Sequence, residues 1–280
     1  LKEMFHQVSI ISNDQDAQRF LWRNGDTSQP PKTYVMQRMI FGAACSPTTA
    51  QLVQNCNAKD FMQEFPRAAA GIIEKHYVDD YVDCFDSEEE AIQTVKDVKF
   101  IHEAGGFKMH NLLTNSQVVS KALCISNDKE IDVVTDNIER ILGMHWKSHS
   151  DLFVFVLKFH KVPKDILDLK AVPTKRQLLS VAMSIFDPFG FVADFMIVIK
   201  ILMQEIWKSG IDWESKLPEE IYKKFKLWLN ELHKITQFQI PRFYCAECYI
   251  KKIELHMFCD ASEEATAAVG YWRIENTSTS

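Results

Sequence analysis

The sequence predicts an α+β fold, because strand-like and helix-like stretches occur in separate blocks along the chain. Over roughly the first 160 residues the two kinds are mixed, the next 80 or so residues are mainly helical, and a new β segment follows. The chain has 280 residues, of which 46% are hydrophobic and 25% charged. This is the composition of a globular protein of about two domains, and it excludes a disordered or fibrous protein.

The N-terminal block begins with a polar, turn-rich segment over 12–33, which predicts a loop or hairpin. Residues 34–42 are rich in β-branched and aromatic side chains and predict a strand that ends at Gly42. The mixture of polar and apolar residues over 48–64 predicts a helix with Pro47 in its first turn, where a missing backbone donor costs nothing.

Aromatic and β-branched residues lie on both sides of Asp79-Asp80 and predict a β-hairpin over 72–85 with the two acids at its turn. The next helix has clear end signals. Ser87 and Glu90 have the spacing of a capping box, and Gly105-Gly106 ends the helical pattern.

The second half opens with a predicted strand over 152–159. Helices then dominate. Thr174 and Gln177 have capping-box spacing, the Asp-Pro-Phe-Gly segment 187–190 breaks that helix, and an amphipathic helix follows over 191–208. Pro218 opens another helix with one apolar stripe. Apolar residues alternate over 250–260 and predict a strand, and a further strand-like run passes through residues 271–273.

The formal net charge is −6, which argues against a protein that coats nucleic acid by charge alone. This net charge is the sum of an acidic segment, a basic segment and the rest of the chain. Residues 74–103 hold ten acids against three lysines, whereas residues 158–176 hold six bases against two acids. Seven scattered cysteines indicate a reducing, intracellular environment, and no apolar stretch is long enough to span a membrane. We therefore predict a cytoplasmic protein without membrane contact.

The most informative motif is Tyr77-Val78-Asp79-Asp80. Two carboxylates at a tight turn repel each other, and bound Mg²⁺ offsets that repulsion because it prefers oxygen ligands. Two such ions can activate a 3′-hydroxyl and stabilise a leaving pyrophosphate. Aspartate is also a favoured turn residue, so the motif alone leaves a purely structural interpretation open.

This motif, flanked by apolar strands, closely resembles the core motif of reverse transcriptases. Four other segments resemble further parts of that family, in the order the family requires. They are the segment after the first palm aspartate (4–8), the nucleotide pocket (41–47), the turn after the palm helix (105–109) and the primer-holding hairpin (141–146). Within that superfamily, the sequence resembles the polyprotein of Pao/BEL retrotransposons. The segments that carry this narrower resemblance are 20–23, 77–81, 184–190, 211–213 and the pattern Lys200, Gln204, Glu205 and Trp207.

The resemblance implies three parts: a reverse-transcriptase palm, an antiparallel sheet with packed helices, over 1–160; a helical thumb and connection over 161–244; and the first strand of a ribonuclease H-like domain over 250–280. It implies an RNA-directed DNA polymerase acting on an RNA or DNA template–primer and deoxynucleotides, within a larger polyprotein and, in the parent element, a virus-like particle.

Site residues follow from the same resemblance. Asp79 and Asp80 match the catalytic metal ligands for two Mg²⁺ ions, and Phe5 matches an aromatic steric gate against a ribose 2′-hydroxyl. The remaining matches are Phe41 and Gly42 for the nucleotide pocket and Leu142 and Gly143 for the primer-holding turn. Phe5 could equally be a core aromatic. From charge alone, phosphate contacts are predicted for four bases that could instead be solvated: Lys161, Lys164, Lys175 and Arg176.

Two departures from the family pattern put catalysis in question. The third palm carboxylate is expected immediately before Leu1, and Asn111-Leu112 stand where the group has Lys-Trp. Asparagine cannot donate a proton to pyrophosphate or neutralise its charge as lysine would. We therefore expect no polymerase activity from these 280 residues alone. The alternative is a degenerate or host-retained relic that serves as a non-catalytic nucleic-acid-binding or structural module.

The C-terminal segment raises two further hypotheses. Residues 255–262 resemble the first strand of a ribonuclease H domain, in which Asp260 is the first metal-binding carboxylate; as a lone strand it would leave unpaired edges and be poorly ordered. Cys245 and Cys248, with His256 and Cys259 beyond them, leave a choice between a zinc site and reduced thiols. His256 and Cys259 lie on opposite faces of the predicted strand, which favours reduced thiols.

Overall fold

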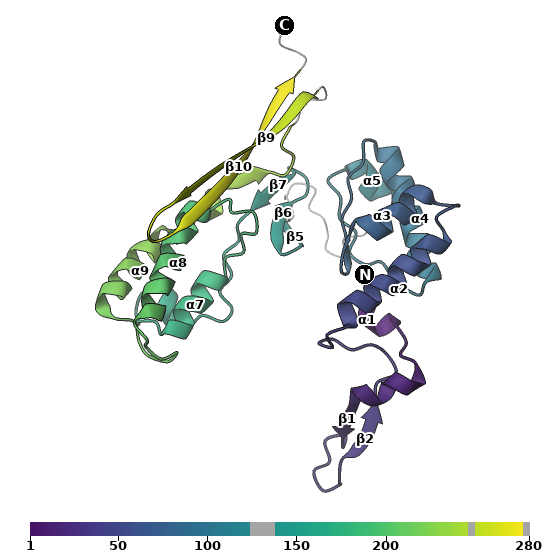
Figure 1. Cartoon of the computed structure of the whole chain (residues 1–280), viewed down its shortest axis with the longest axis horizontal. Helices are drawn as coiled ribbons and strands as arrows, with labels where there is room; N and C mark the ends of the chain where they lie inside the picture. Colours follow the sequence, from purple (N-terminus) through teal and green to yellow (C-terminus); the bar gives the residue numbers. More distant parts are fainter. Residues whose placement is uncertain (124–137, 246–249, 277–280) are drawn as a thin grey trace. The chain divides into compact units, whose positions relative to one another are not determined.

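The computed structural model describes residues 1–123, 138–245 and 250–276, and divides the chain into two compact units, Leu1–Val133 and Val134–Ser280 (Figure 1). Both units combine helices with antiparallel strands, which confirms the predicted α+β class. The division lies before residue 160, because strands within 138–154 pair with a strand at 239–241. In the described ranges, no helix is long and apolar enough to cross a membrane.

The first unit begins with α1 (Met4–Gln7), a 3₁₀ helix η1 (Ser12–Gln18) and the hairpin β1 (Arg19–Trp22) with β2 (Lys32–Val35). The predicted hairpin is present, but the strand predicted over 34–42 ends at Val35. Beyond it, the only ladder contact among the described residues is a single bridge between Ser9 and Arg38. A β-prone segment forms a strand only where a partner strand lies alongside.

Three helices form the core of the first unit: α2 (Ser46–Asp60), α3 (Pro66–Glu74) and α4 (Glu88–Ala104). Pro47 lies in the first turn of α2 as predicted. Helix α3 replaces the beginning of the predicted 72–85 hairpin, because Ile72 packs inward with residues of the neighbouring helices. The Ser87 hydroxyl caps α4 by accepting from the Glu90 amide at 3.1 Å, and α4 ends at Gly105 as predicted. A short helix, α5 (Gln117–Ala122), follows.

The second unit contains a four-stranded antiparallel sheet in the order β5 (Ile138–Ile141), β6 (Met144–Lys147), β7 (Leu152–Val154) and β8 (Gln239–Pro241). The strand predicted over 152–159 ends at Val154. Phe155, Leu157 and Phe159 pack against the helical core instead of extending the ladder. The alternation of apolar residues predicts a longer strand than the one that forms, because the side chains after Val154 are buried against the helices.

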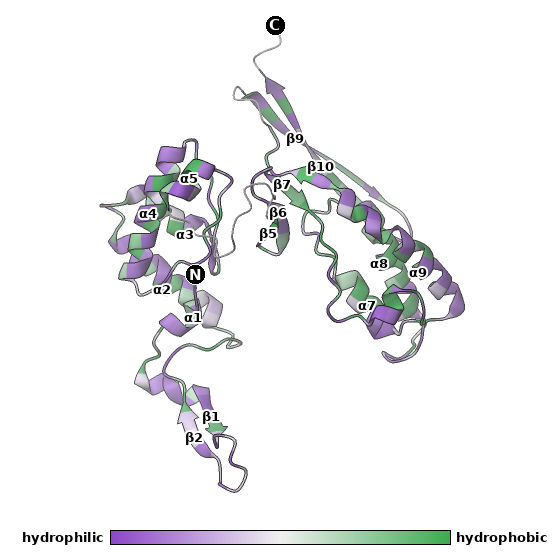
Figure 2. Ribbon diagram, turned by 180° about the vertical axis from the view of Figure 1, so that it is seen from behind, coloured by the Kyte–Doolittle hydropathy of each residue, from purple (hydrophilic) through white to green (hydrophobic). Residues whose placement is uncertain are grey.

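The helical core of the second unit comprises α6 (Lys164–Leu167), α7 (Lys175–Met183), α8 (Ala193–Lys208), α9 (Glu219–Glu231) and the 3₁₀ helix η2 (Leu232–Gln237). The Thr174–Gln177 capping box is present with both hydrogen bonds. Asp187 ends the α7 segment and accepts from the Phe191 and Val192 amides, each at 2.9 Å, just before α8. Helix α8 is mostly apolar (green in Figure 2), consistent with its central place in this core.

The C-terminal segment is a ribbon of two long antiparallel strands, β9 (Ile250–Ala261) and β10 (Thr266–Asn276). The predicted strand over 250–260 is confirmed. The expectation of a lone strand is wrong, because β10 pairs with β9 along nearly its whole length. One face of the ribbon is apolar, and its members are Ile253, Leu255, Met257, Trp272 and Ile274.

Candidate active site

The two acids of the Tyr-Val-Asp-Asp motif lie at a minimal β-hairpin. Strand β3 (His76–Tyr77) pairs with β4 (Asp80–Tyr81), and Val78 and Asp79 form the turn between them. Both aspartates are exposed. Val78 has a φ of +56°, a conformation that costs a β-branched residue energy and is found where the surrounding structure imposes it. The hairpin is much shorter than predicted, but the acids are at its turn.

The electrostatics of the turn favour a cation. Partial burial and the negative charge of Asp79 raise the pKa of Asp80. Ionised carboxylates are acceptor-only groups, and two exposed ones side by side can supply two oxygen ligands to a divalent ion. Within the described ranges, no group of three or more His, Cys, Asp or Glu side chains could hold a metal. The described residues therefore place only two carboxylates at this turn, which is at most a part of a metal ligand set.

The structure brings the N-terminal residues to this turn and joins them to residue 108. The backbone nitrogen of Leu1 donates to the carbonyl oxygen of Asp79, and the amide of Lys2 donates to the carbonyl oxygen of Lys108 at 2.8 Å. Residues 1–2 and 108 therefore lie beside the acidic turn within the first unit. These segments are distant in sequence, and their meeting does not follow from local patterns.

A partly buried histidine of the strand and a buried histidine of the helix lie next to the turn. The Nε2 atoms of His76, in β3, and His102, in the last turn of α4, are 3.1 Å apart. Burial lowers the pKa of His76 to about 3, with a further contribution from His102, and burial lowers the pKa of His102 to about 4. Both rings are therefore neutral at pH 7. One nitrogen of the pair donates and the other accepts.

Neither histidine belongs to a motif with metal-ligand or catalytic spacing in the sequence. Only one local signal pointed to His102: it lies four residues after Val98 and therefore on the buried side of α4. The other side of the hairpin is also anchored. The Tyr81 hydroxyl donates to Asp83 at 2.7 Å, and Asp83 pairs with Arg67 at 2.9 Å. The acidic turn is thus fixed to α4 through His76 and to α3 through Arg67.

Two of the predicted nucleotide-pocket residues are in contact. The Phe5 and Phe41 rings meet edge to face, with centroids 5.0 Å apart, and His6 also contacts Phe41. Phe5 is partly buried, whereas Phe41 is 64% exposed and available to a ligand. Gly42 has a φ of +88° with open space where a side chain would be, so its role is conformational.

The predicted primer-holding residues lie in the second unit. Leu142 and Gly143 form the β5–β6 turn, with φ values of +48° and +89°, as a tight type I′ hairpin requires. Gly143 also lies under the ring of Phe186, from the Phe-Asp-Pro-Phe-Gly segment, and an added Cβ would be 2.7 Å from that ring. Both backbone conformation and packing demand glycine here.

We predict that Gly143→Ala destabilises the protein by about 1–3 kcal/mol, because alanine would suffer both a left-handed backbone and a clash with Phe186. Urea unfolding measures this loss. Gly210→Ala is a matched control, since Gly210 has a similar φ of +70° and nothing within 4 Å of its Cβ position. If the two variants lose the same stability, packing against Phe186 contributes nothing.

The predicted phosphate-contacting bases fall into two groups. Lys161 and Lys164 are exposed, and Arg176 is exposed but paired with Glu214 at 2.6 Å. Lys175 is only 8% exposed, and the prediction for it is corrected. Its Nζ lies 4.4 Å from the Trp207 ring centroid and 5.3 Å from that of Trp213, and it donates to the Ile211 carbonyl at 3.1 Å. The ammonium is therefore held inside the protein.

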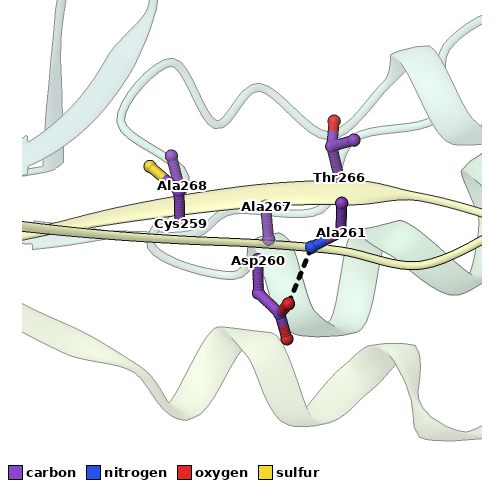
Figure 3. Close-up of a pocket in the computed structure, with 6 residues that line it drawn as sticks. All are labelled: Cys259, Asp260, Ala261, Thr266, Ala267 and Ala268. Carbon is purple, nitrogen blue, oxygen red and sulfur yellow. Dashed lines mark hydrogen bonds between the residues drawn. The ribbon is translucent and has the colours of Figure 1, made fainter.

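Asp260 lies near the end of β9, opposite Ala267 of β10, on an exposed surface of the ribbon (Figure 3). Its carboxylate accepts from the Ala261 amide at 2.8 Å and points to the opposite side of the ribbon from Cys259. Of the hypothetical zinc ligands, Cys248 lies outside the described residues. Asn111, where the family pattern has lysine, is exposed with a φ of +54°.

Comparison with known proteins identifies part of the chain. Residues 174–280 match the family described as Pao retrotransposon-like RNaseH-like domain. The match includes α7, α8, α9 and the β9–β10 ribbon, and it begins within the segment predicted as thumb and connection. No curated protein matches the chain. Residues 174–280 are therefore similar to the Pao retrotransposon-like RNaseH-like domain family, which supports the predicted Pao/BEL relationship for that part of the chain.

Proposed function

We propose that this chain is a reverse-transcriptase segment of a Pao/BEL-type retrotransposon polyprotein, with palm residues in the first unit and the RNaseH-like domain in the second. Template- and primer-dependent addition of deoxynucleotides is the proposed reaction, in a cytoplasmic virus-like particle. The observation that carries the proposal is the turn at Asp79-Asp80, which exposes two carboxylates and whose Asp79 carbonyl oxygen accepts from the backbone nitrogen of Leu1.

Each group at this site has a defined task in the proposal. Asp79 and Asp80 would hold Mg²⁺, which when bound supplies the charge that activates the 3′-hydroxyl and stabilises pyrophosphate. Phe5, held by Phe41, would exclude a ribose 2′-hydroxyl from the nucleotide pocket. A residue joined to the Leu1 nitrogen would lie next to Asp79, because that nitrogen contacts the Asp79 carbonyl oxygen. This contact agrees with a third carboxylate at that position.

A second candidate is a non-catalytic module that retains the fold and binds nucleic acid. Asn111 favours it, since an exposed amide cannot serve as the cation or acid that the family has there. The exposed Lys161 and Lys164 could then contact phosphates in either candidate.

Primer extension with Mg²⁺ by a version of the protein extended upstream of Leu1 tests the proposal. Asp79→Asn is expected to reduce extension by about a thousandfold or more while template–primer binding changes less than about twofold, because the amide keeps the shape but loses the charge. Asp97→Asn, a change of the same kind at a partly buried position of α4, is the control. If the extended protein lacks extension activity but binds template–primer in a salt-dependent manner, the non-catalytic candidate replaces the first.

A further inference from the structure

The hairpin that carries Asp79 and Asp80 needs support from outside its own strands. Two residue pairs join β3 to β4, and a two-stranded hairpin is marginally stable in water even when it is longer. Val78 in the turn has a left-handed φ of +56°, which a β-branched residue adopts only under constraint. Contacts beyond the hairpin must therefore fix the turn.

A buried carboxylate just after β4 supplies such contacts. The Asp83 side chain is 4% exposed, and its Oδ2 atom accepts from the Tyr81 hydroxyl at 2.7 Å and pairs with Nη2 of Arg67 at 2.9 Å. The Oδ1 atom accepts from the Cys84 amide at 2.9 Å. A carboxylate buried this deeply is stable only when its charge is paired and its oxygens are hydrogen-bonded. Because Tyr81 directly follows Asp80, these contacts attach the acidic turn to α3.

Arg67 is itself fixed on three sides. Besides Asp83, its guanidinium pairs with Glu90 of α4 at 3.2 Å and lies 5.0 Å from the ring centroid of Phe85. A guanidinium is a planar, rigid group of donors, so two carboxylates and a ring together determine its orientation. Arg67, Asp83 and Tyr81 thus form one connected network between two helices and the hairpin.

The network lies directly on the backbone of α3 at Gly71. A Cβ added to this buried glycine would be 2.8 Å from the Tyr81 hydroxyl oxygen and 3.2 Å from Nη1 of Arg67. In the interior of an ordinary helix, alanine is more favourable than glycine. The close approach of the network therefore explains the glycine, whereas helix formation does not.

The same contacts separate Asp83 from the two acids of the turn. Three acids so close in sequence resemble a set of metal ligands, but Asp79 and Asp80 are exposed while Asp83 is buried and occupied by protein donors. A metal ligand needs a lone pair directed at the ion. Asp83 acts on the turn through Tyr81 and the backbone, and not as a third ligand.

We propose that Arg67, Asp83 and Tyr81 are positioning residues that fix the carboxylates of the acidic turn and thereby set its affinity for Mg²⁺. The inference rests on the proposed function, because it concerns the same site. When the network is broken, Val78 is free to leave its left-handed conformation and the two carboxylates diverge. The Mg²⁺ requirement then rises, as it does when outer partners of metal ligands are removed.

Hydrogen exchange of the amides of residues 76–82 in the whole chain measures the order of the hairpin without activity or metal. Arg67→Gln leaves Asp83 buried without its cation and is expected to speed this exchange at least about tenfold, with less than about twofold change over 94–101 of α4. Adding Asp83→Asn removes the unpaired charge and is expected to restore exchange to within about threefold of the wild type. Arg19→Gln, which breaks an ion pair between exposed side chains, is the matched control and is expected to change nothing.

The Mg²⁺ concentration for half-maximal primer extension, by the protein extended upstream of Leu1, is the second readout. We expect it to rise about tenfold in Arg67→Gln, with less than about threefold change in the rate at saturating Mg²⁺, and to recover when Asp83→Asn is added. A direct ligand role for Asp83 predicts the reverse, since its loss would deepen the defect. A wild-type protein that does not extend primers contradicts the proposed function, and the exchange measurement alone then decides the inference.

Two further variants keep the test decisive if Arg67→Gln does not fold. Tyr81→Phe removes only the hydroxyl that donates to Asp83, and Gly71→Ala brings a methyl group against that hydroxyl. Each is expected to speed exchange in the hairpin by about threefold or more. The inference is overturned if Arg67→Gln exchanges like Arg19→Gln, if both further variants exchange like the wild type, or if Asp83→Asn deepens the Mg²⁺ defect of Arg67→Gln.

Discussion

Lowering the pH from 7 to 4 is expected to destabilise the first unit by several kcal/mol through one pair of side chains, His76 and His102. Burial keeps both rings neutral in the folded protein, with pKa values of about 3 and about 4, against 6.5 for an ordinary histidine. The unfolded chain therefore takes up protons at a higher pH than the folded one. This contribution to stability is complete above pH 6.5 and is lost as the pH falls toward 4.

The environment of the pair explains why the pKa values are low. Tyr81 packs against His76 and Phe107 against His102, and the two histidine rings meet edge to face, with centroids 5.1 Å apart. In the described part of the chain, neither Nδ1 has a hydrogen-bond partner. Each histidine contributes about 1.4 kcal/mol per pH unit within the window, so the slope for both is roughly 2–3 kcal/mol per unit.

Urea unfolding followed by circular dichroism at several pH values between 7 and 4 measures this slope. The double variant His76→Phe with His102→Leu replaces both partners by apolar groups and is expected to flatten the profile between pH 6.5 and 5. At pH 7, His102→Leu alone is expected to cost about 1–3 kcal/mol, because it leaves the His76 nitrogen buried without a partner. The exposed His149→Gln is the control. A slope that persists in the double variant would assign the acid sensitivity to other groups.

The elements that the sequence predicted well are those fixed by neighbouring residues. The Thr174–Gln177 capping box, the Ser87 cap, the Pro218 start of α9 and the glycines after α4 depend on contacts within a few positions. The length of a strand depends instead on a partner elsewhere in the chain. The strand predicted over 34–42 has little to pair with, and the ribbon gains β10 as the partner of β9.

In the candidate site, too, local features could be predicted from the sequence and long-range contacts could not. The motif at Asp79-Asp80 was recognisable because four consecutive residues carry it, and its acids do lie at a turn. The His76–His102 contact joins residues 26 positions apart, and the contact of Leu1 with Asp79 joins residues 78 apart. The periodicity of apolar residues in the sequence does not reveal contacts between residues so far apart. Charge alone was equally unable to distinguish Lys161, which is exposed, from Lys175, which is enclosed by two tryptophans.

Replacing Lys175 by glutamate is expected to cost about 4 kcal/mol or more, the second large effect that the structure predicts. The ammonium contacts the faces of Trp207 and Trp213, which attract a cation and repel an anion, and it donates to the Ile211 carbonyl. A carboxylate there would be buried against two negative ring faces and a carbonyl oxygen, which are unfavourable neighbours for a negative charge.

The position of Lys175 in its helix excludes one alternative explanation of such a loss. Lys175 is the first residue of α7, where a negative side chain normally stabilises a helix by up to about 1 kcal/mol. A large loss from Lys175→Glu therefore does not come from the helix but from the site that encloses the side chain: the two tryptophans, the Ile211 carbonyl and the burial of a charge. Urea unfolding followed by tryptophan fluorescence measures it, and Lys200→Glu on the exposed side of α8 is expected to stay within about 0.5 kcal/mol.

Lys175→Met separates the structural role from the phosphate contact that charge alone predicted. Methionine fills the space between the tryptophans and removes only the charge, so a moderate loss of about 1–2 kcal/mol is expected, with oligonucleotide affinity unchanged at pH 7. The opposite result, unchanged stability with weaker binding and a smaller salt slope, would mean that Lys175 leaves the tryptophans to meet phosphate. Because Lys175 is 8% exposed and its Nζ donates to the protein's own backbone, the structure favours the first result.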